Sequence, residues 1–202
     1  MSKNSSTRYD RAYFDRWYRD PETRVKSGVA IRRKASLALS VAEYYLERPV
    51  RTVLDVGCGE GNWLPALISL RPKIRYTGVD ASTYAVERFG KKRNIRLGTF
   101  ATLEEIGLRE DYDLIVCSDT LFYLPLIELE QGIASLAHRS AGVAFLELYT
   151  GEDSLVGDFP NEGLQSASFY RKMLTQHGFL SVGCHCYLGP DMAERAMQME
   201  QA

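Results

Sequence analysis

The stretch from Val53 to Trp63 constrains the fold of this chain more than any other part of the sequence. It begins as an apolar, β-branched run that can be buried on both faces, as a central parallel strand must be. It continues through Gly57, Gly59 and Gly61 into a segment that is compatible with a helix. Glycines let the backbone turn sharply and approach a ligand, and the following helix points free N–H groups at it. The stretch therefore predicts a strand, a ligand-binding loop and a helix.

The spacing of these glycines separates two kinds of ligand. The dinucleotide-binding pattern G-x-G-x-x-G requires a third glycine at the position where this chain has Asn62. The pattern here is G-x-G-x-G instead, so a nicotinamide-dependent oxidoreductase is the least favoured enzyme class. A tight turn that binds no ligand is the alternative to a binding loop.

The composition is that of a globular protein, with 202 residues, 45% of them hydrophobic and 25% charged. No apolar run approaches the roughly 18 residues of a membrane span, and residues 1–7 lack the core of a signal peptide. We therefore expect a cytoplasmic protein without a membrane partner. The four cysteines form no disulfide framework, and residues 184–186 offer too few ligands on one face of a strand for zinc, so we expect no metal site.

Strand-like and helix-like patterns alternate from residue 50 onward. Helices are expected from residue 63 to about 70, before Gly90, and at 126–138 and 168–177, and strands at 50–56, 74–79, 95–97, 112–117, 143–148 and 179–188. This alternation produces parallel βαβ units. We predict an α/β fold, a Rossmann-like doubly wound and mostly parallel sheet with helices on both faces.

Residues 1–49 are expected to form an amino-terminal helical extension, and residues 50–202 the core domain. Within the extension, Tyr9, Tyr13 and Trp17 recur with helical spacing and would form an aromatic stripe on one helix over residues 8–19, beside Phe14 and Tyr18. The stripe either packs against the main domain or covers a bound ligand as a lid, with Tyr13 nearest. A second helix is expected over residues 27–47, with a serine as its N-cap.

Asp80 ends the second expected strand, about 20 residues after the glycine loop. A carboxylate at this place can accept hydrogen bonds from the ribose hydroxyls of an adenosyl ligand. An Asp at a strand end more often caps a helix, but its position after a glycine loop favours the ribose role. Ala81 and Ser82 would then lie beside the adenine.

Several segments together resemble the motifs of the class I S-adenosylmethionine (SAM)-dependent methyltransferases. They are Leu54–Gly61, Tyr76–Asp80, Tyr112–Asp119 and the apolar fifth strand. The resemblance covers roughly residues 50–188. It implies SAM as the cofactor and a methyl transfer as the reaction.

The resemblance also implies roles for single residues. Gly57 and Gly59 would approach the methionine portion of SAM, and Asp55 would bind its amine directly or through water. Asp80 would bind the ribose. The other residues expected at the cofactor are Cys58, Ala81, Ser82, Phe100, Ser118 and Tyr13.

The chain departs from the family pattern at two places. Many relatives carry an acidic residue after the third strand, which binds the adenine amino group, whereas here residues 98–101 contain none. Phe100 is expected to offer a backbone N–H and a stacking surface instead. The usual antiparallel seventh strand has no clear candidate, because the chain becomes polar and helical after Pro190.

Asp119 follows the fourth strand, at the edge of the sheet where ligands bind, and is the candidate catalytic residue. It either caps the next helix or faces the cofactor and the acceptor. Its segment is similar to that of the nodulation N-methyltransferases, and it lacks the Asn-Pro-Pro-Tyr pattern of enzymes that methylate nucleobases or glutamine amides. Asp119, Glu147 and the acidic residues of loop 150–167 (Glu152, Asp153 and Asp158) would form an acidic mouth suited to an amine, or else the loop is simply solvated.

The sequence therefore predicts a SAM-dependent methyltransferase of a small-molecule acceptor, with an amine as the favoured acceptor. An RNA methyltransferase is one alternative, because Lys and Arg outnumber Asp and Glu in the amino-terminal half. The acidic carboxyl-terminal half argues against a nucleic-acid partner. A SAM-binding module without catalytic activity is the other alternative.

Overall fold

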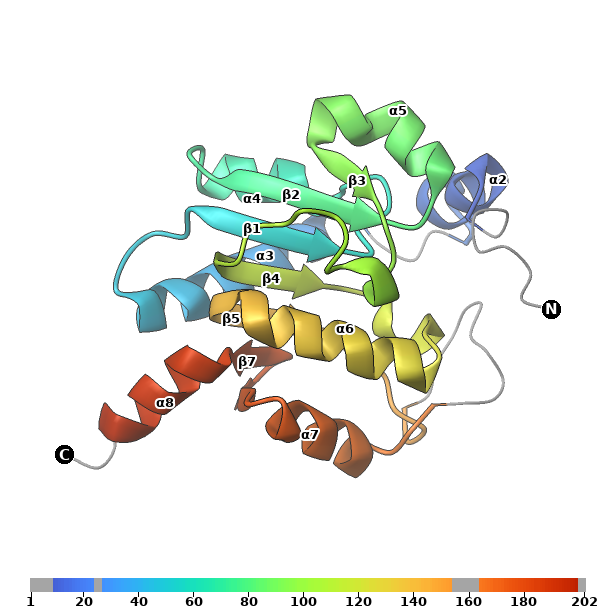
Figure 1. Ribbon diagram of the computed structural model, residues 1–202. Helices are drawn as coiled ribbons and strands as arrows, with labels where there is room; N and C mark the ends of the chain where they lie inside the picture. Colours follow the sequence, from blue (N-terminus) through green and yellow to red (C-terminus); the bar gives the residue numbers. More distant parts are fainter. Residues whose placement is uncertain (1–8, 24–26, 154–163, 200–202) are drawn as a thin grey trace.

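The computed structural model describes residues 9–23, 27–153 and 164–199. Within these residues the chain forms a seven-stranded sheet with the order β3-β2-β1-β4-β5-β7-β6 (Figure 1). The first five strands pair in parallel, whereas β7 is antiparallel to both β5 and β6. The strands are β1 (Thr52–Val56), β2 (Arg75–Asp80), β3 (Ile95–Leu97), β4 (Tyr112–Cys117), β5 (Ser140–Leu146), β6 (Leu180–Gly183) and β7 (Cys186–Leu188). The predicted Rossmann-like, mostly parallel sheet is confirmed.

Helices cover both faces of this sheet, and in Figure 1 α6 lies in front of it with α3 and α4 behind. No helix in the described ranges has the length and apolar character needed to cross a membrane. The helical segments are α2 (Arg11–Phe14), the π-helix η1 (Asp15–Arg19), α3 (Gly28–Leu46), α4 (Trp63–Leu70), α5 (Thr83–Arg93), the 3₁₀ turns η2 (Phe100–Thr102) and η3 (Leu121–Tyr123), α6 (Leu126–Arg139), α7 (Ala167–Gln176) and α8 (Pro190–Met199).

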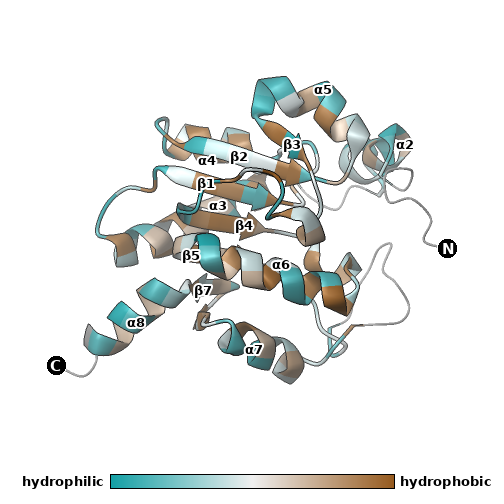
Figure 2. Cartoon of the chain, in the orientation of Figure 1, coloured by the Kyte–Doolittle hydropathy of each residue, from teal (hydrophilic) through white to brown (hydrophobic). Residues whose placement is uncertain are grey.

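The central strands are buried on both faces, which explains their almost continuous apolar sequence. Successive side chains of a strand point to opposite faces. Val53 of β1 therefore belongs to the core under α3, α4 and α8, whereas the next residue, Leu54, belongs to the core under α6 and α7. Their partners Leu114 and Ile115 on β4 divide in the same way. Figure 2 shows the corresponding apolar centre of the sheet.

Helix α3 is part of the layer that covers the sheet. Ser27 caps its amino terminus, since the hydroxyl accepts a hydrogen bond from the Ala30 N–H, as the sequence predicted. Its buried face packs into the same core as β1 and β4, and consists of Ile31, Ala35, Ala38, Leu39 and Ala42. The division of the chain at residue 49 stays a prediction.

The single last strand expected over residues 179–188 is wrong, because the chain forms two strands there. Gly183, Cys184 and His185 have φ angles of 87°, 52° and 62° and reverse the chain between β6 and β7. Strand β7 then returns antiparallel to β5. It provides the antiparallel seventh strand for which the sequence offered no clear candidate, and β6 forms the edge of the sheet.

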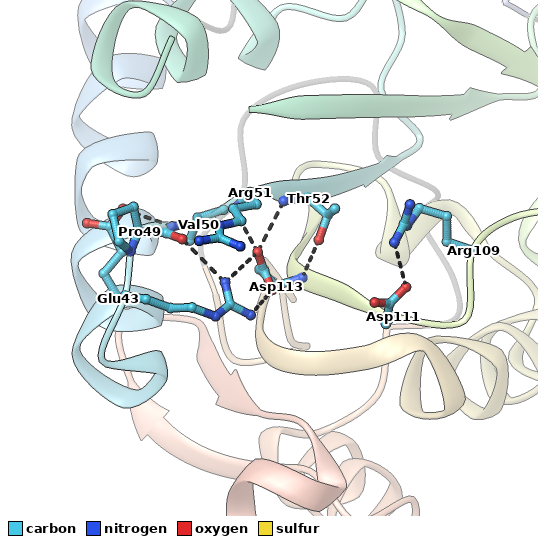
Figure 3. A network of polar contacts seen from close by, with 9 residues as sticks. Glu43, Pro49, Val50, Arg51, Thr52, Arg109, Asp111 and Asp113 are labelled. Atoms are coloured by element: carbon cyan, nitrogen blue, oxygen red, sulfur yellow. Dashed lines mark hydrogen bonds and ion pairs between the residues drawn. The ribbon is translucent and has the colours of Figure 1, made fainter. Parts of the chain in front are cut away.

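A polar network at the amino ends of β1 and β4 is centred on Asp113 (Figure 3). Its carboxylate accepts hydrogen bonds from Arg48 at 2.7 and 3.0 Å and from the backbone N–H groups of Arg51 at 2.7 Å and Thr52 at 3.2 Å. Burial acts to raise the pKa of Asp113, but these donors and the charge of Arg48 outweigh it and lower the pKa below its usual range. The network joins the two central strands where they begin.

Candidate active site

The glycine loop predicted between β1 and α4 is present, and its three glycines have a left-handed backbone. Gly57, Gly59 and Gly61 have φ angles of 71°, 55° and 76°, where side chains other than glycine are strained. A Cβ atom at Gly59 would lie 2.7 Å from the hydroxyl oxygen of Tyr18, and one at Gly57 would overlap the side chain of Thr120. The loop is therefore packed closely from both sides and needs glycine at these positions.

Asp80 holds the middle of this loop. Its carboxylate oxygens accept hydrogen bonds from the backbone N–H of Gly59 at 2.6 Å and that of Ser82 at 2.9 Å. Burial raises the pKa of Asp80, and the two N–H donors partly oppose this shift. The cap of α5 is Ser82, whose hydroxyl accepts from the Ala85 N–H, so Asp80 does not act as the helix cap. Each carboxylate oxygen can accept a further hydrogen bond, as a ribose diol would require.

Two other residues expected at the cofactor are buried, one at the end of β1 and one within the loop. Asp55 is buried and accepts a hydrogen bond from the hydroxyl of Tyr76 at 2.7 Å. Cys58 is also buried, and burial, followed by the charges of Asp55 and Asp80, raises the pKa of its thiol well above the usual value. The thiol is therefore protonated and packs as a small apolar group.

The amino-terminal segment lies over the outer side of the loop, but with a different face from the one predicted. The helix α2 passes into the π-helix η1, in which the N–H of Asp20 donates to the carbonyl of Asp15. Phe14 is 2% exposed, and its ring and that of Tyr18 are the side chains nearest Gly59. These two residues also have helical i, i+4 spacing, which is the sequence signal that could have found them.

Tyr13 lies within this aromatic cluster, with ring centroids 5.1 Å from Tyr9 and 5.5 Å from Phe14. Burial, and after it the charge of Asp80, raises the pKa of Tyr18 well above the usual value, so its hydroxyl stays protonated. This hydroxyl lies beside Gly59 and can donate a hydrogen bond to a ligand. The lid role of Tyr13 stays a prediction.

Polar contacts tie the same segment to the loop and to α5. Arg19 forms an ion pair of 2.5 Å with Glu60, which lies between the second and third glycines of the loop. The hydroxyl of Ser82 donates to the backbone carbonyl of Tyr9 at 2.5 Å, so Ser82 is covered by the segment. Ala81 lies beside it and is half-buried. The segment thus closes one side of the loop.

The turn after β4 brings Ser118 and Asp119 to the same edge of the sheet. Asp119 has a φ of 56°, and its carboxylate accepts a hydrogen bond of 3.0 Å from the hydroxyl of Tyr149. The hydroxyl of the following residue, Thr120, donates to the carbonyl of Gly57 at 3.2 Å. The structure therefore places the candidate catalytic residue next to the glycine loop.

The acidic mouth predicted around Asp119 is largely engaged in contacts within the protein. Glu147 is 4% exposed and forms an ion pair of 2.5 Å with Lys34 of α3. Glu152 accepts a hydrogen bond from the backbone of Ala167, and Asp153 accepts from the backbone of residue 150. Asp158 lies outside the described residues. The prediction that Glu147 serves as a carboxylate for an amine is therefore corrected, because a lysine of the protein occupies that role.

Phe100 does not offer the stacking surface that was expected. Its ring is 3% exposed and packs against Gly132 of α6, where a Cβ atom would overlap it. The ring belongs to the core under α6, because a glycine on that helix leaves room for it. The role of its backbone N–H stays a prediction.

A cavity of about 490 Å³ lies beside the loop, between η1, the first turn of α3 and one face of α4. Its polar lining comes from Tyr18, Arg32, Asn62 and Ser69, and Asn62 directly follows the last glycine of the loop. Arg32 donates to the Ser69 hydroxyl at 3.1 Å. No group of three or more His, Cys, Asp or Glu side chains in the described part of the chain is arranged to hold a metal ion.

Comparison with known proteins shows which proteins this chain is similar to. The family described as a methyltransferase domain matches residues 54–140, which include the glycine loop, Asp80 and Asp119. Over these residues, which are less than half of the chain, the protein is similar to methyltransferases. A malonyl-[acyl-carrier protein] O-methyltransferase from Anoxybacillus flavithermus is 32% identical over 112 residues, which cover 53% of this chain and 42% of that protein. The enzyme of the same name from Bacillus cereus is 31% identical over 91 residues, covering 44% and 34%. The chain thus spans less than half the length of these curated relatives.

Solved structures share the fold of this domain over most of the chain. The magnesium protoporphyrin IX methyltransferase from Synechocystis, with bound SAM, has a TM-score of 0.58 at 20% identity and covers 91% of each chain. An amino pentose methyltransferase from Micromonospora echinaspora, also with SAM, has a TM-score of 0.60 at 15% identity and covers 82% of this chain and 93% of its own. At these identities the likeness concerns the fold.

Proposed function

We propose that this protein is an enzyme that binds SAM at the carboxyl ends of β1 and β2 and transfers its methyl group to a small-molecule acceptor. The observation that carries the proposal is the contact between Asp80 and Gly59, whose N–H lies 2.6 Å from the carboxylate. This contact brings a carboxylate of the type that binds ribose and the glycine loop together in one site. The left-handed glycines and the protonated Tyr18 hydroxyl fit the methionine portion of the cofactor.

Methyl transfer from SAM mainly requires that the protein orient the acceptor. When bound, SAM supplies a methyl group on a sulfonium, with a neutral thioether as the leaving group. The protein must hold a nucleophile in line with that methyl and keep water away, which can supply much of the rate. Phe14 and Tyr18 cover the glycine loop on one side, and the turn that carries Asp119 borders it on the other.

Asp119 favours an acceptor with an exchangeable proton, above all an amine. A neutral amine can donate a hydrogen bond to the Asp119 carboxylate and point its lone pair at the methyl. After transfer the methylated nitrogen is cationic, and Asp119 can take one of its protons and pass it to water. A carboxylate beside the nucleophile also favours the positive charge that develops there.

An anionic acceptor is the second candidate. The cavity beside the loop is lined by Arg32, a guanidinium suited to a carboxylate, together with the polar groups of Asn62 and Ser69. The partial matches to malonyl-[acyl-carrier protein] O-methyltransferases support the same class of acceptor. Arg32 and Asp119 thus favour acceptors of opposite charge, and a panel of acceptors distinguishes them.

We also propose that the protein works in the cytoplasm and that residues 1–49 act as the helical cover of the core in residues 50–202. All four cysteines are free thiols, as is usual in a reducing compartment. The contacts of Phe14 and Tyr18 with the glycine loop support the covering role.

The test separates cofactor binding from methyl transfer with two variants. Asp80→Ala removes a charged acceptor, so SAM affinity measured by calorimetry should fall about tenfold or more, since each such hydrogen bond is worth about 1.5–3 kcal/mol. Asp119→Asn keeps the shape and should lower turnover strongly while SAM affinity stays within about twofold. Turnover is measured as S-adenosylhomocysteine released with amines, phenols, carboxylates and a short RNA. Asp111→Asn, whose side chain is 68% exposed at the opposite end of β4, is the control.

Each outcome bears on one part of the proposal. Unchanged SAM affinity in a folded Asp80→Ala variant would remove Asp80 from the site. Turnover of carboxylates alone would favour the anionic acceptor, and methylation of RNA alone would replace the small-molecule assignment. A wild-type protein that binds SAM and methylates nothing in the panel would indicate a binding module.

A further inference from the structure

The chain that continues from β5 holds the turn after β4 at two consecutive residues. The N–H of Glu147 donates to the carbonyl of Cys117 at 3.0 Å. The segment after β5 therefore stays paired with the end of β4. Glu147 and Tyr149 are two residues apart, and side chains with this spacing in an extended chain point the same way. Glu147 binds the hydroxyl of Ser118 at 2.6 Å, and Tyr149 donates to Asp119 at 3.0 Å.

Glu147 is fixed by partners from two elements. One of its oxygens accepts from Lys34 of α3 and the other from Ser118. A buried carboxylate is costly unless it is paired, and here Lys34 neutralises it. Glu147 therefore anchors the turn while its charge is paired with that of Lys34.

Tyr149 is held in place by its ring as well as by its hydroxyl. The ring packs edge-on against Phe122 with centroids 5.1 Å apart. Burial first, and then the charges of Glu147, Asp153 and Tyr123, raise the pKa of Tyr149 to about 12. Its hydroxyl therefore stays protonated at any working pH and remains a hydrogen-bond donor to Asp119.

We propose that Tyr149 is a positioning residue for methyl transfer, because its hydroxyl fixes the orientation of the Asp119 carboxylate toward the acceptor. The inference rests on the proposed function, since it adds a second residue to the same acceptor site. Asp119 lies on a left-handed turn between β4 and η3, so the direction of its carboxylate depends on the hydrogen bonds that it accepts. The hydrogen bond from Tyr149 supplies that direction.

Tyr149→Phe removes only the hydroxyl and keeps the ring contact with Phe122. Its kcat should fall about tenfold or more, while the SAM Kd stays within about twofold of wild type, because the lost contact acts on the acceptor side. In the Asp119→Asn background the same change should cause no further loss, since Tyr149 acts through Asp119. Tyr44→Phe, on the exposed face of α3 with 77% exposure, is the matched control.

A second measurement does not depend on turnover. Carbon-13 spectra of the side-chain carboxyls assign Asp119 as the resonance missing from Asp119→Asn. A donated hydrogen bond favours the charged carboxylate, so this resonance should titrate at higher pH in Tyr149→Phe than in wild type. Among the described residues, the charged and titratable groups that act on Tyr149 are Glu147, Asp153 and Tyr123, and Lys34 pairs with Glu147.

Three results would overturn the inference. They are an unchanged kcat in Tyr149→Phe, a full additional loss in the double variant, and an unchanged titration of the Asp119 resonance. If the wild-type protein fails to bind SAM, the proposed function is contradicted instead. The carboxyl spectra would still report whether Tyr149 acts on Asp119.

Discussion

Gly59 shows at the scale of one residue how closely the loop is built. A side chain there meets the Tyr18 hydroxyl at 2.7 Å and the Phe14 ring at 3.2 Å, and its φ of 55° costs a residue other than glycine about 1–2 kcal/mol. Gly59→Val should therefore abolish SAM binding measurable by calorimetry, because the valine either displaces the aromatic cover or occupies the ligand's place. The variant should remain folded, with a lower melting temperature.

Gly28→Val is the control for this prediction. A Cβ atom at Gly28 meets nothing within 4 Å, and the residue has an ordinary helical backbone at the start of α3. Its SAM affinity should match wild type. Retained SAM binding by a folded Gly59→Val protein would mean that the loop is only a turn.

At the scale of elements, the segment of α2 and η1 is the part of the described chain most suited to respond to the cofactor. It is held by the aromatic contacts of Phe14 and Tyr18 and by the ion pair between Arg19 and Glu60, and not by a sheet. We expect its backbone amides over residues 11–19 to exchange quickly in the free protein and to gain protection with S-adenosylhomocysteine. Hydrogen exchange read by mass spectrometry measures this.

The amides of α8, which lies at the opposite edge of the sheet from this segment in Figure 1, are the internal reference and should not change. Equal exchange of residues 11–19 with and without the ligand would show plain packing and no lid. Faster exchange in Arg19→Met than in wild type is expected in the free protein, since the ion pair to Glu60 is lost.

The bounds of the central strands were predicted closely because their environment is uniform. Strands β1, β2 and β4 are buried on both faces, so their apolar runs mark them within one or two residues. The hairpin of β6 and β7 was missed because its turn uses Cys184 and His185 in left-handed conformations, which such residues rarely adopt. Only the neighbouring glycine at position 183 signalled it.

The role of a side chain could be predicted where the path of the backbone determines its position. It could not be predicted where the packing of distant side chains determines that position. Asp80 meets the glycine loop because parallel strands end at one edge of the sheet, which the spacing implies. Phe14 and Tyr18, and not the predicted stripe, lie nearest Gly59, and the sequence does not signal the π-helical turn that follows Phe14. The Phe100 ring depends on a glycine in α6, and the pairing of Glu147 with Lys34 joins residues more than a hundred positions apart.

At the scale of the whole molecule, Asp113 is the main polar anchor between β1 and β4 (Figure 3). Its side chain is 7% exposed, and Asp113→Asn leaves Arg48 and two backbone N–H groups with a weaker partner. The free energy of unfolding should fall by about 2–4 kcal/mol. Urea unfolding at pH 7 measures it, and Asp111→Asn, an exposed pair with Arg109, should stay within about 0.5 kcal/mol of wild type.

The same anchor predicts how stability changes in acid. The pKa of Asp113 is lowered in the folded protein, so its contribution is fully present above the unfolded value of about 3.9 and is lost as the pH falls through the folded pKa. The difference between wild type and Asp113→Asn should be constant from pH 7 to about pH 5 and should shrink below pH 4. A difference that is the same at pH 7 and pH 3 would contradict this role.

Strand β4 carries this anchor near its first residue and ends just before the turn that bears Asp119. Its six residues, at about 3.3 Å each, separate the two ends by roughly 16 Å, or about two screening lengths in physiological salt. Substitutions this far apart, with no shared partner, usually have additive effects. The acceptor end can therefore accumulate changes that alter which molecule is methylated while the anchor keeps the fold intact, which gives this small scaffold room to evolve new specificities.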